Sequence, residues 1–183
     1  MENKKTIILN FIGAPGVGKS TTMAGVFSNL KADGVDCEQV TEFAKELVWE
    51  RRGETFKDEL YIFAKQYHRL FIVVGKVDVV VTDRPLVITA CYNNRSEKPI
   101  RGLSEMAIDA FKEYENINIL LNRVKKYNPN GRNQTEEESD EIGREIRQIL
   151  DENHIDYMTL DADENVVERA VEIVKKRLAE RNR

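Results

Sequence analysis

Apolar residues in this 183-residue chain gather in short runs that alternate with longer amphipathic stretches. The runs at 6–12 and 77–83 are dense in β-branched and large apolar residues, which is typical of strands buried on both faces. Weaker runs at 35–40, 117–122 and 156–162 complete a set of five predicted strands. Strands that alternate with helices predict βαβ units and a parallel sheet that helices cover on both faces.

Apolar residues at helical spacing fill the segments between these runs. The expected helices cover residues 20–32, 42–52, 57–76, 104–115, 136–153 and 164–182. Gly53 is expected to end the second of them. The third is expected to bury one stripe, formed by Leu60, Phe63, Ala64, Tyr67, Phe71 and Val74. Because no repeat or linker interrupts the pattern, residues 1–183 are predicted to form a single domain.

The overall composition narrows the class of protein. Apolar residues make up 41% and charged residues 33% of the chain, which is typical of globular proteins. The formal net charge of −4 disfavours nucleic acid as the main partner without excluding it. No apolar stretch approaches the roughly 18–20 residues of a membrane helix, and the N-terminal segment lacks the apolar region of a signal peptide. We therefore expect a cytoplasmic protein without membrane contact, as a monomer or small homo-oligomer.

The strongest motif directly follows the first buried run. Residues 13–20 fit the P-loop pattern G-x-x-x-x-G-K-[ST], with a predicted strand before them and a predicted helix after them. Glycines let successive backbone N–H groups converge on an anion at a helix N-terminus. The motif predicts that Lys19 contacts the β- and γ-phosphates of a nucleotide and that the Ser20 hydroxyl binds Mg²⁺. The residues expected to bind the nucleotide are Gly13, Ala14, Pro15, Gly16, Val17, Gly18, Lys19, Ser20 and Thr21.

An acidic residue ends the second strongly apolar run. The carboxyl ends of parallel strands meet at one edge of a sheet, so Asp83 is expected near the P-loop, where it would position Mg²⁺ directly or through water. The alternative role for Asp83 is to cap the following helix. Arg84 comes next, where a GTPase would continue the motif D-x-x-G. An acidic residue followed by arginine at this place resembles small-molecule P-loop kinases, whose arginine serves the substrate or the phosphoryl charge.

Glu42 follows the predicted strand at 35–40, and the topology brings it to the same edge of the sheet. In nucleoside kinases a glutamate at this location accepts the proton of the attacking hydroxyl, so Glu42 and Asp83 are both candidates for the general base. Alternatively, Glu42 is a first-turn residue that favours the dipole of a helix capped by Thr41. Gln66 on the next helix either pairs with a base edge of the substrate or is an exposed polar residue.

A polar, basic loop is predicted at 123–136, between the fourth strand and a helix. Loops of this length in compact domains are usually functional. Its cationic side chains are those of Arg123, Lys125, Lys126 and Arg132. Mobile arginines stabilise the charge that develops during phosphoryl transfer, so Arg123 and Arg132 are predicted to belong to a lid over the nucleotide. A solvated basic loop is the alternative.

Taken together, the segments GAPGVGKST, TEFAKEL, VVVTDRPLVITACY, LLNR and 130–152 resemble the P-loop domains of ribosylnicotinamide-kinase type. These are the kinase half of the NadR type and its stand-alone relatives in bacteria and phages, among the AAA-like ATPases and kinases. The resemblance spans almost the whole chain. It implies a three-layer α/β/α P-loop NTPase fold with a five-stranded parallel sheet in the order 2-3-1-4-5. It also implies ATP with Mg²⁺ as the donor, with GTP as the alternative.

The sequence thus predicts a P-loop phosphotransferase that moves the γ-phosphoryl group of ATP to a hydroxyl of ribosylnicotinamide or a related nucleoside, in NAD metabolism. The predicted catalytic residues are Lys19, Glu42, Asp83, Arg84, Arg123 and Arg132. The acceptor is expected to contact Glu42, Gln66 and Arg84, and Mg²⁺ to bind Ser20 and Asp83. Two alternatives stay open: a kinase of nucleoside monophosphates or of modified bases in DNA, and a regulatory ATP- or GTP-binding module without an acceptor.

Overall fold

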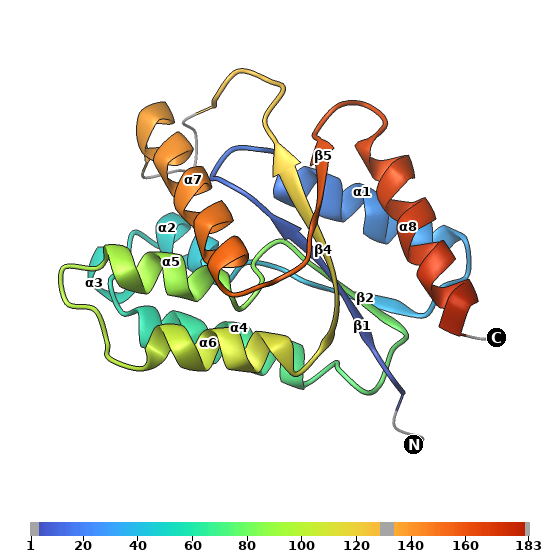
Figure 1. Ribbon diagram of the computed structural model, residues 1–183, viewed down its shortest axis with the longest axis horizontal. Coiled ribbons are helices and arrows are strands. Elements are labelled where there is room, and N and C mark those ends of the chain that lie inside the picture. Colours follow the sequence, from blue (N-terminus) through green and yellow to red (C-terminus); the bar gives the residue numbers. More distant parts are fainter. Residues whose placement is uncertain (1–3, 129–133, 182–183) are drawn as a thin grey trace.

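A parallel sheet of five strands crosses the protein, which the computed structural model describes over residues 4–128 and 134–181. Its strands are β1 (Ile7–Ile12), β2 (Cys37–Val40), β3 (Val79–Thr82), β4 (Glu115–Asn122) and β5 (Met158–Asp161). They are hydrogen-bonded in the order β2-β3-β1-β4-β5 (Figure 1), and every neighbouring pair is parallel. The predicted α/β fold of P-loop NTPase type and its strand order are therefore confirmed.

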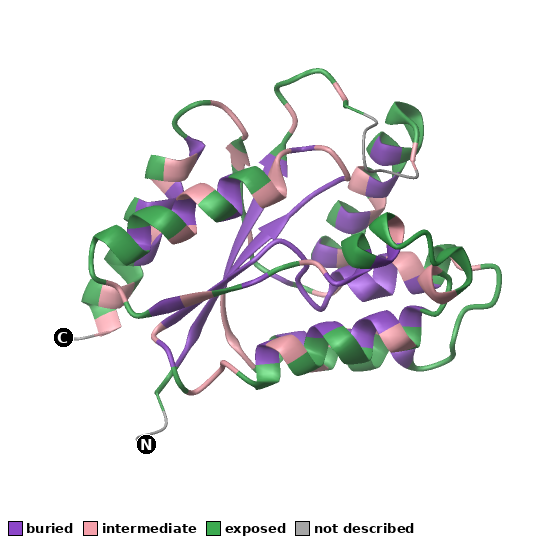
Figure 2. Cartoon of the chain, turned by 180° about the vertical axis from the view of Figure 1, so that it is seen from behind, coloured by how far each residue is buried: buried purple, intermediate pink, exposed green. Residues whose placement is uncertain are grey.

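Helices cover both faces of this sheet. They are α1 (Lys19–Ala32), α2 (Ala44–Trp49), α3 (Gly53–Phe56), α4 (Glu59–Phe71), α5 (Ile88–Arg95), α6 (Leu103–Lys112), α7 (Glu136–Glu152) and α8 (Val166–Arg181). The apolar residues of α1 and α8 form one buried cluster with the sheet, and those of α4, α5, α6 and α7 form another. Figure 2 shows the buried strands between helices whose outer sides are exposed. In the described ranges, no helix is both long enough and apolar enough to pass through a bilayer.

The register of the central strands places three chain segments at the same edge of the sheet. Asn10 of β1 pairs with Thr82 of β3, and Thr82 pairs with Val40 of β2. Because these strands are parallel, the segments that follow them emerge side by side. The fold thus brings the loop at 13–18 close to the segments that carry the two predicted carboxylates.

The chain between β2 and α4 differs from its prediction. The helix expected over 42–52 ends at Trp49, and Gly53 begins α3 instead of ending a helix. The end of α2 is a left-handed turn at Arg51, whose φ is 55°, followed by a hydrogen bond from the N–H of Arg52 to the carbonyl of Leu47. Glycine is the usual residue at such a turn, so the sequence carried no signal for this helix end.

The buried face of α4 also differs from the predicted stripe. The residues that α4 buries are Glu59, Ile62, Phe63, Gln66 and Leu70. Leu60, Tyr67 and Phe71 are exposed instead, Phe71 by 63%. The helix is rotated so that two polar side chains point inward, and a pattern of apolar positions cannot anticipate such a rotation.

Candidate active site

The loop between β1 and α1 has the backbone shape of an anion-binding nest. Gly13, Gly16 and Gly18 have positive φ angles of 140°, 84° and 102°. A Cβ atom at Gly13 would lie 3.0 Å from the carbonyl oxygen of Leu121 in β4, so a larger residue does not fit there without a shift of the backbone. Gly18 directly precedes α1, whose first N–H groups add partial positive charge at the loop. This is the geometry that phosphate binding requires.

Lys19, the first residue of α1, turns back over this loop. Its Nζ donates hydrogen bonds to the carbonyl oxygens of Gly13 at 2.8 Å and Ala14 at 3.0 Å. The ammonium group is thereby held beside the nest, where it adds a full positive charge to the partial charges of the N–H groups.

Helix α7 supports the P-loop from the other side, which the sequence did not predict. The buried Ser139 hydroxyl donates a 2.7 Å hydrogen bond to the carbonyl of Pro15. One turn further along, a Cβ atom at Gly143 would lie only 3.2 Å from the Cβ of Ala14, so the glycine allows α7 to approach closely. A glycine within an otherwise strong helical pattern is the one sequence signal that points to such a contact.

Ser20 and Asp83, the two residues predicted to hold Mg²⁺, are in direct contact. The Ser20 hydroxyl donates a 2.5 Å hydrogen bond to Oδ2 of Asp83, and the backbone N–H of Glu42 donates a 2.9 Å bond to Oδ1. Asp83 does not cap the following helix, because α5 begins five residues later with Val87 as its N-cap. Asp83 instead joins the segments after β2 and β3 to the start of α1.

The donor chemistry of this pair suits magnesium. A hydroxyl and a carboxylate are hard oxygen ligands of the kind that Mg²⁺ prefers, and Mg²⁺ usually binds one or two protein groups together with phosphate oxygens and water. Within residues 4–128 and 134–181, no group of three or more His, Cys, Asp or Glu side chains could hold a metal ion by itself. The residues present therefore fit a magnesium ion that arrives with a nucleotide.

Arg84 forms a buried charge cluster with two carboxylates. Its Nη1 donates to Oε1 of Glu42 at 3.2 Å, its Nη2 donates to Oε1 of Glu59 at 2.8 Å, and its Cζ lies 4.5 Å from the centre of the Tyr92 ring. Burial opposes the charge of Arg84, but the two carboxylates outweigh burial and raise the pKa of Arg84 above its usual value. Burial raises the pKa of Glu59, although Arg84 acts in the opposite direction. Arg84 thus stays cationic, and two carboxylates share its charge.

Glu42 lies between β2 and α2. Since α2 begins two residues later with Phe43 as its N-cap, Glu42 is not a first-turn residue and Thr41 does not cap the helix. The backbone of Glu42 is fixed by Asp83 and its carboxylate by Arg84, while 26% of its side chain stays exposed. The alternative in which Glu42 is a first-turn residue after a Thr41 cap is therefore wrong, and its role as a general base stays a prediction.

Gln66 is buried, and it does not line the cavity between the P-loop and Glu42 that is described below. It is 2% exposed, and its amide accepts from the N–H of Phe43 at 3.0 Å and donates to the carbonyl of Thr41 at 3.4 Å. Gln66 thus fixes the backbone on both sides of Glu42. The expected contact between Gln66 and a substrate base stays a prediction that this geometry does not support.

The basic loop contributes one described arginine to this region. Arg123 forms ion pairs with Glu136 and Asp140 at the start of α7, and its Cζ lies 5.4 Å from the ring centre of Tyr127. These contacts tie the beginning of the loop to α7. Arg132, the other arginine predicted to belong to a lid, lies outside the described residues.

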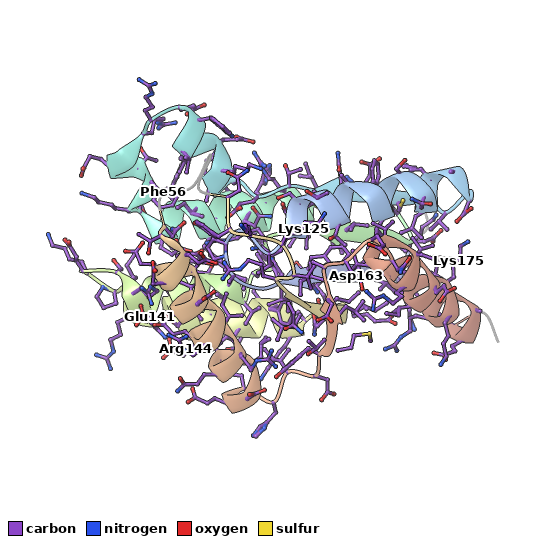
Figure 3. The ribbon with its side chains drawn as sticks, turned by 90° about the horizontal axis from the view of Figure 1, so that it is seen from above. Phe56, Lys125, Glu141, Arg144, Asp163 and Lys175 are labelled. Atoms are coloured by element: carbon purple, nitrogen blue, oxygen red, sulfur yellow. The ribbon has the colours of Figure 1, made fainter. Side chains whose placement is uncertain are left out.

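A cavity of about 230 Å³ joins the P-loop to the segment of α2 and α3. Gly18, Lys19 and Ser20 line one part of it, and Glu42 and Arg84 line another. A second cavity of about 460 Å³ adjoins the first, and the residues common to both are Ala44, Phe56, Arg84 and Tyr92. Figure 3 shows this edge of the sheet from above, with Phe56 on the segment of α2 and α3, Glu141 on α7 and Lys125 on the loop after β4.

Comparison with known proteins places the chain in a family. Over residues 8–169, from β1 to the first turn of α8, the sequence matches a family model described as an AAA domain. None of the curated proteins compared with the chain matches it. The matched range includes the P-loop, Glu42, Asp83, Arg84 and Arg123.

Proposed function

The chain belongs to the AAA domain family, and we propose that it is a small-molecule kinase, which transfers the γ-phosphoryl group of ATP, or of GTP, to a hydroxyl of a nucleoside-like acceptor. The observation that carries this proposal is a single cavity lined by both the P-loop and the pair Glu42 and Arg84. A nucleotide-binding switch needs only the first of these walls. A carboxylate on the second wall suits a second reactant that must lose a proton.

The contacts of the two carboxylates suggest different roles. Both oxygens of Asp83 accept hydrogen bonds, one from Ser20 and one from the backbone of Glu42, so Asp83 is suited to hold and orient. Glu42 uses Oε1 for Arg84, and within the described residues its Oε2 accepts no hydrogen bond. We therefore assign the general base to Glu42, whose Oε2 takes the proton of the acceptor hydroxyl as that oxygen attacks the γ-phosphorus.

On the donor side, the P-loop N–H groups and Lys19 bind the phosphates and stabilise the charge that develops on them. Mg²⁺, held by Ser20 and Asp83, neutralises phosphate charge when it is bound. Arg123 and Arg132 are proposed as further cations. For Arg123 this role requires the release of its ion pairs with α7.

The two arginines at the second cavity are both engaged by carboxylates. Arg84 is already shared by two carboxylates, and Arg95 is paired with Glu145 at 2.5 Å. A nucleoside monophosphate would need a cation that is open to its phosphate, and Lys98, which also lines this cavity, is the candidate for that role. Ribosylnicotinamide or a related nucleoside, the acceptor that the resemblance of the sequence implies, is our proposed acceptor, ahead of a nucleoside monophosphate or a base in DNA.

The test is a transfer assay with γ-labelled ATP, Mg²⁺ and a panel of nucleosides that includes ribosylnicotinamide. Glu42→Gln should lower transfer by about 10²- to 10⁴-fold, the usual contribution of a general base, and should leave ATP affinity within a few fold. Glu38→Gln is the matched control, because Glu38 lies on β2 shortly before Glu42, pairs with Lys31 and does not line the cavity.

Two outcomes separate the candidate functions, and a third tests the assignment of the general base. Transfer to nucleoside monophosphates or DNA alone would support the kinases that we rank lower. ATP binding without transfer to any nucleoside, nucleotide or DNA hydroxyl would refute the kinase and leave a regulatory module. Equal transfer by the wild type and Glu42→Gln would refute the assignment of the base.

A further inference from the structure

Glu59 is a buried carboxylate that lines the second cavity but not the cavity at the P-loop. It is the first residue of α4, after Asp58, whose side chain caps the helix by accepting from the N–H of Tyr61. The side chain of Glu59 is 9% exposed. Carboxylates are rarely buried to this extent unless they are paired and hydrogen-bonded, so the position of Glu59 calls for a reason.

Three features hold the charge of Glu59 in place. Arg84 donates to it at 2.8 Å, and the Thr89 side chain of α5 also lowers the pKa of Glu59 and so favours its charged form. The N-terminal end of α4 adds the favourable field of its helix dipole. Glu59 is therefore anchored by Arg84 and by α5. Because it also lines the second cavity, an effect through Arg84 has to be distinguished from a direct contact with an acceptor.

The link from Glu59 continues through Arg84 to Glu42. A guanidinium group is planar and presents its N–H groups in a rigid fork. With Nη2 fixed on Glu59 and Cζ held over the Tyr92 ring, 4.5 Å from its centre, the direction of Nη1 is restricted as well. That direction leads to Oε1 of Glu42, at 3.2 Å.

We propose that Glu59 is a positioning residue: by orienting Arg84, it holds the carboxylate of Glu42 where an acceptor hydroxyl can reach it. This inference rests on the proposed kinase function. The reaction then depends on a side chain of α4 that lines the second cavity but touches neither the P-loop nor the reacting atoms. A misplacement of about 1 Å in a catalytic group costs on the order of 10²-fold in rate, which sets the scale of the expected effect.

The experiment compares two substitutions of Glu59, assayed with the nucleoside that the wild type phosphorylates. Glu59→Leu should lower kcat about 10- to 100-fold and leave KM for ATP within about twofold. Glu59→Gln should lose much less, because its amide oxygen can still accept from Arg84. All rates are expressed per ATP-binding site, measured by calorimetric titration, so that a loss of folded protein does not count as a loss of catalysis.

A double-variant cycle with Arg84→Met separates positioning from independent action. If Glu59 acts only through Arg84, Glu59→Leu should lower kcat no further in the Arg84→Met background. The double variant also replaces the buried charged pair by two apolar residues, which keeps this arm measurable if Glu59→Leu alone folds poorly. Glu38→Leu is the control, since Glu38 pairs with the exposed Lys31, lines neither cavity and should leave kcat unchanged.

The outcomes also distinguish this inference from the proposal on which it depends. If the wild type transfers phosphate to a nucleoside but Glu59→Leu keeps its kcat per binding site, or if the losses from Glu59→Leu and Arg84→Met multiply, the positioning role is refuted and the kinase stands. If the wild type transfers phosphate to no hydroxyl, the kinase is refuted, and the role of Glu59 with it.

Discussion

Arg84→Met removes the shared cation of the buried cluster and leaves Glu59 without its charged partner. The two side chains are only 5% and 9% exposed. Removal of one partner of such a buried pair costs about 3–5 kcal/mol in the free energy of unfolding. Glu42 adds little, because 26% of its side chain already reaches solvent. For a chain of 183 residues the entropy of unfolding is about 0.38 kcal/mol per degree, so Tm should fall by about 8–13 °C.

The cost of Arg84→Met should also depend on pH. Burial raises the pKa of Glu59 even while Arg84 is present, and without Arg84 the pKa of Glu59 in the folded state rises further. A carboxyl group whose pKa is higher in the folded state favours folding below its unfolded pKa, near 4.5, and this contribution is lost as the pH rises through the folded pKa. Arg84→Met should therefore be more destabilising at pH 8 than at pH 5.

Urea unfolding at both pH values, followed by circular dichroism, measures this cost for Arg84→Met. The double variant Glu59→Leu/Arg84→Met should regain at least half of the loss, because no unpaired charge is left buried. A cost below about 1 kcal/mol at pH 8, or a cost that is equal at both pH values, would show that Glu59 is not held in a dry environment by Arg84.

Two further predictions concern the P-loop. Gly13→Ala should abolish ATP binding measured by calorimetry, because its Cβ would lie 3.0 Å from the Leu121 carbonyl oxygen and the backbone has a φ of 140°. Gly34→Ala is the control: Gly34 also has a positive φ, but no atom lies within 4 Å of its added Cβ. That variant should lose about 1 kcal/mol of stability and bind ATP normally. Ser139→Ala should lower the free energy of unfolding by about 1 kcal/mol and weaken ATP binding several-fold, because the Pro15 carbonyl loses its hydrogen bond. Thr135→Ala is its control: it removes the N-cap of α7 at a similar cost in stability and should leave ATP affinity unchanged. Normal ATP binding by Gly13→Ala or Ser139→Ala would contradict the respective prediction.

The features that the sequence predicted correctly are those with local causes. Strands β1 and β3 are buried runs of β-branched and large apolar residues, and short runs of this kind are typical of strands in a parallel sheet that is covered on both faces. The P-loop is specified by glycines within eight residues. The predicted position of Asp83 near the P-loop, where it contacts Ser20, follows from parallel strands that end at one edge. In these cases pattern and topology are enough, because the position of each side chain follows from the position of its strand.

The features that the sequence missed depend on partners that are distant in the chain. Gln66 faces inward because the backbone around Glu42 needs its amide, and Glu59 faces inward because Arg84 needs a second carboxylate. With these two included, the positions 59, 62, 63, 66 and 70 form one regular helical stripe. A search for apolar residues alone skips the polar members and selects the exposed stripe of Leu60, Tyr67 and Phe71 instead.

The orientation of α4 and the position of Glu42 in the candidate site have the same cause. A helix that packed only for stability would bury an apolar stripe, and the exposed side of α4 offers one in Leu60, Tyr67 and Phe71. The chain instead buries a carboxylate and an amide, which must both be satisfied by hydrogen bonds at some cost in desolvation. Both inward-facing groups end at Glu42, Gln66 through the backbone on either side of it and Glu59 through Arg84. A stretch of chain that served only as a connection between β2 and α2 would not need two such supports, so the burial of polar groups on α4 supports the proposed role of Glu42.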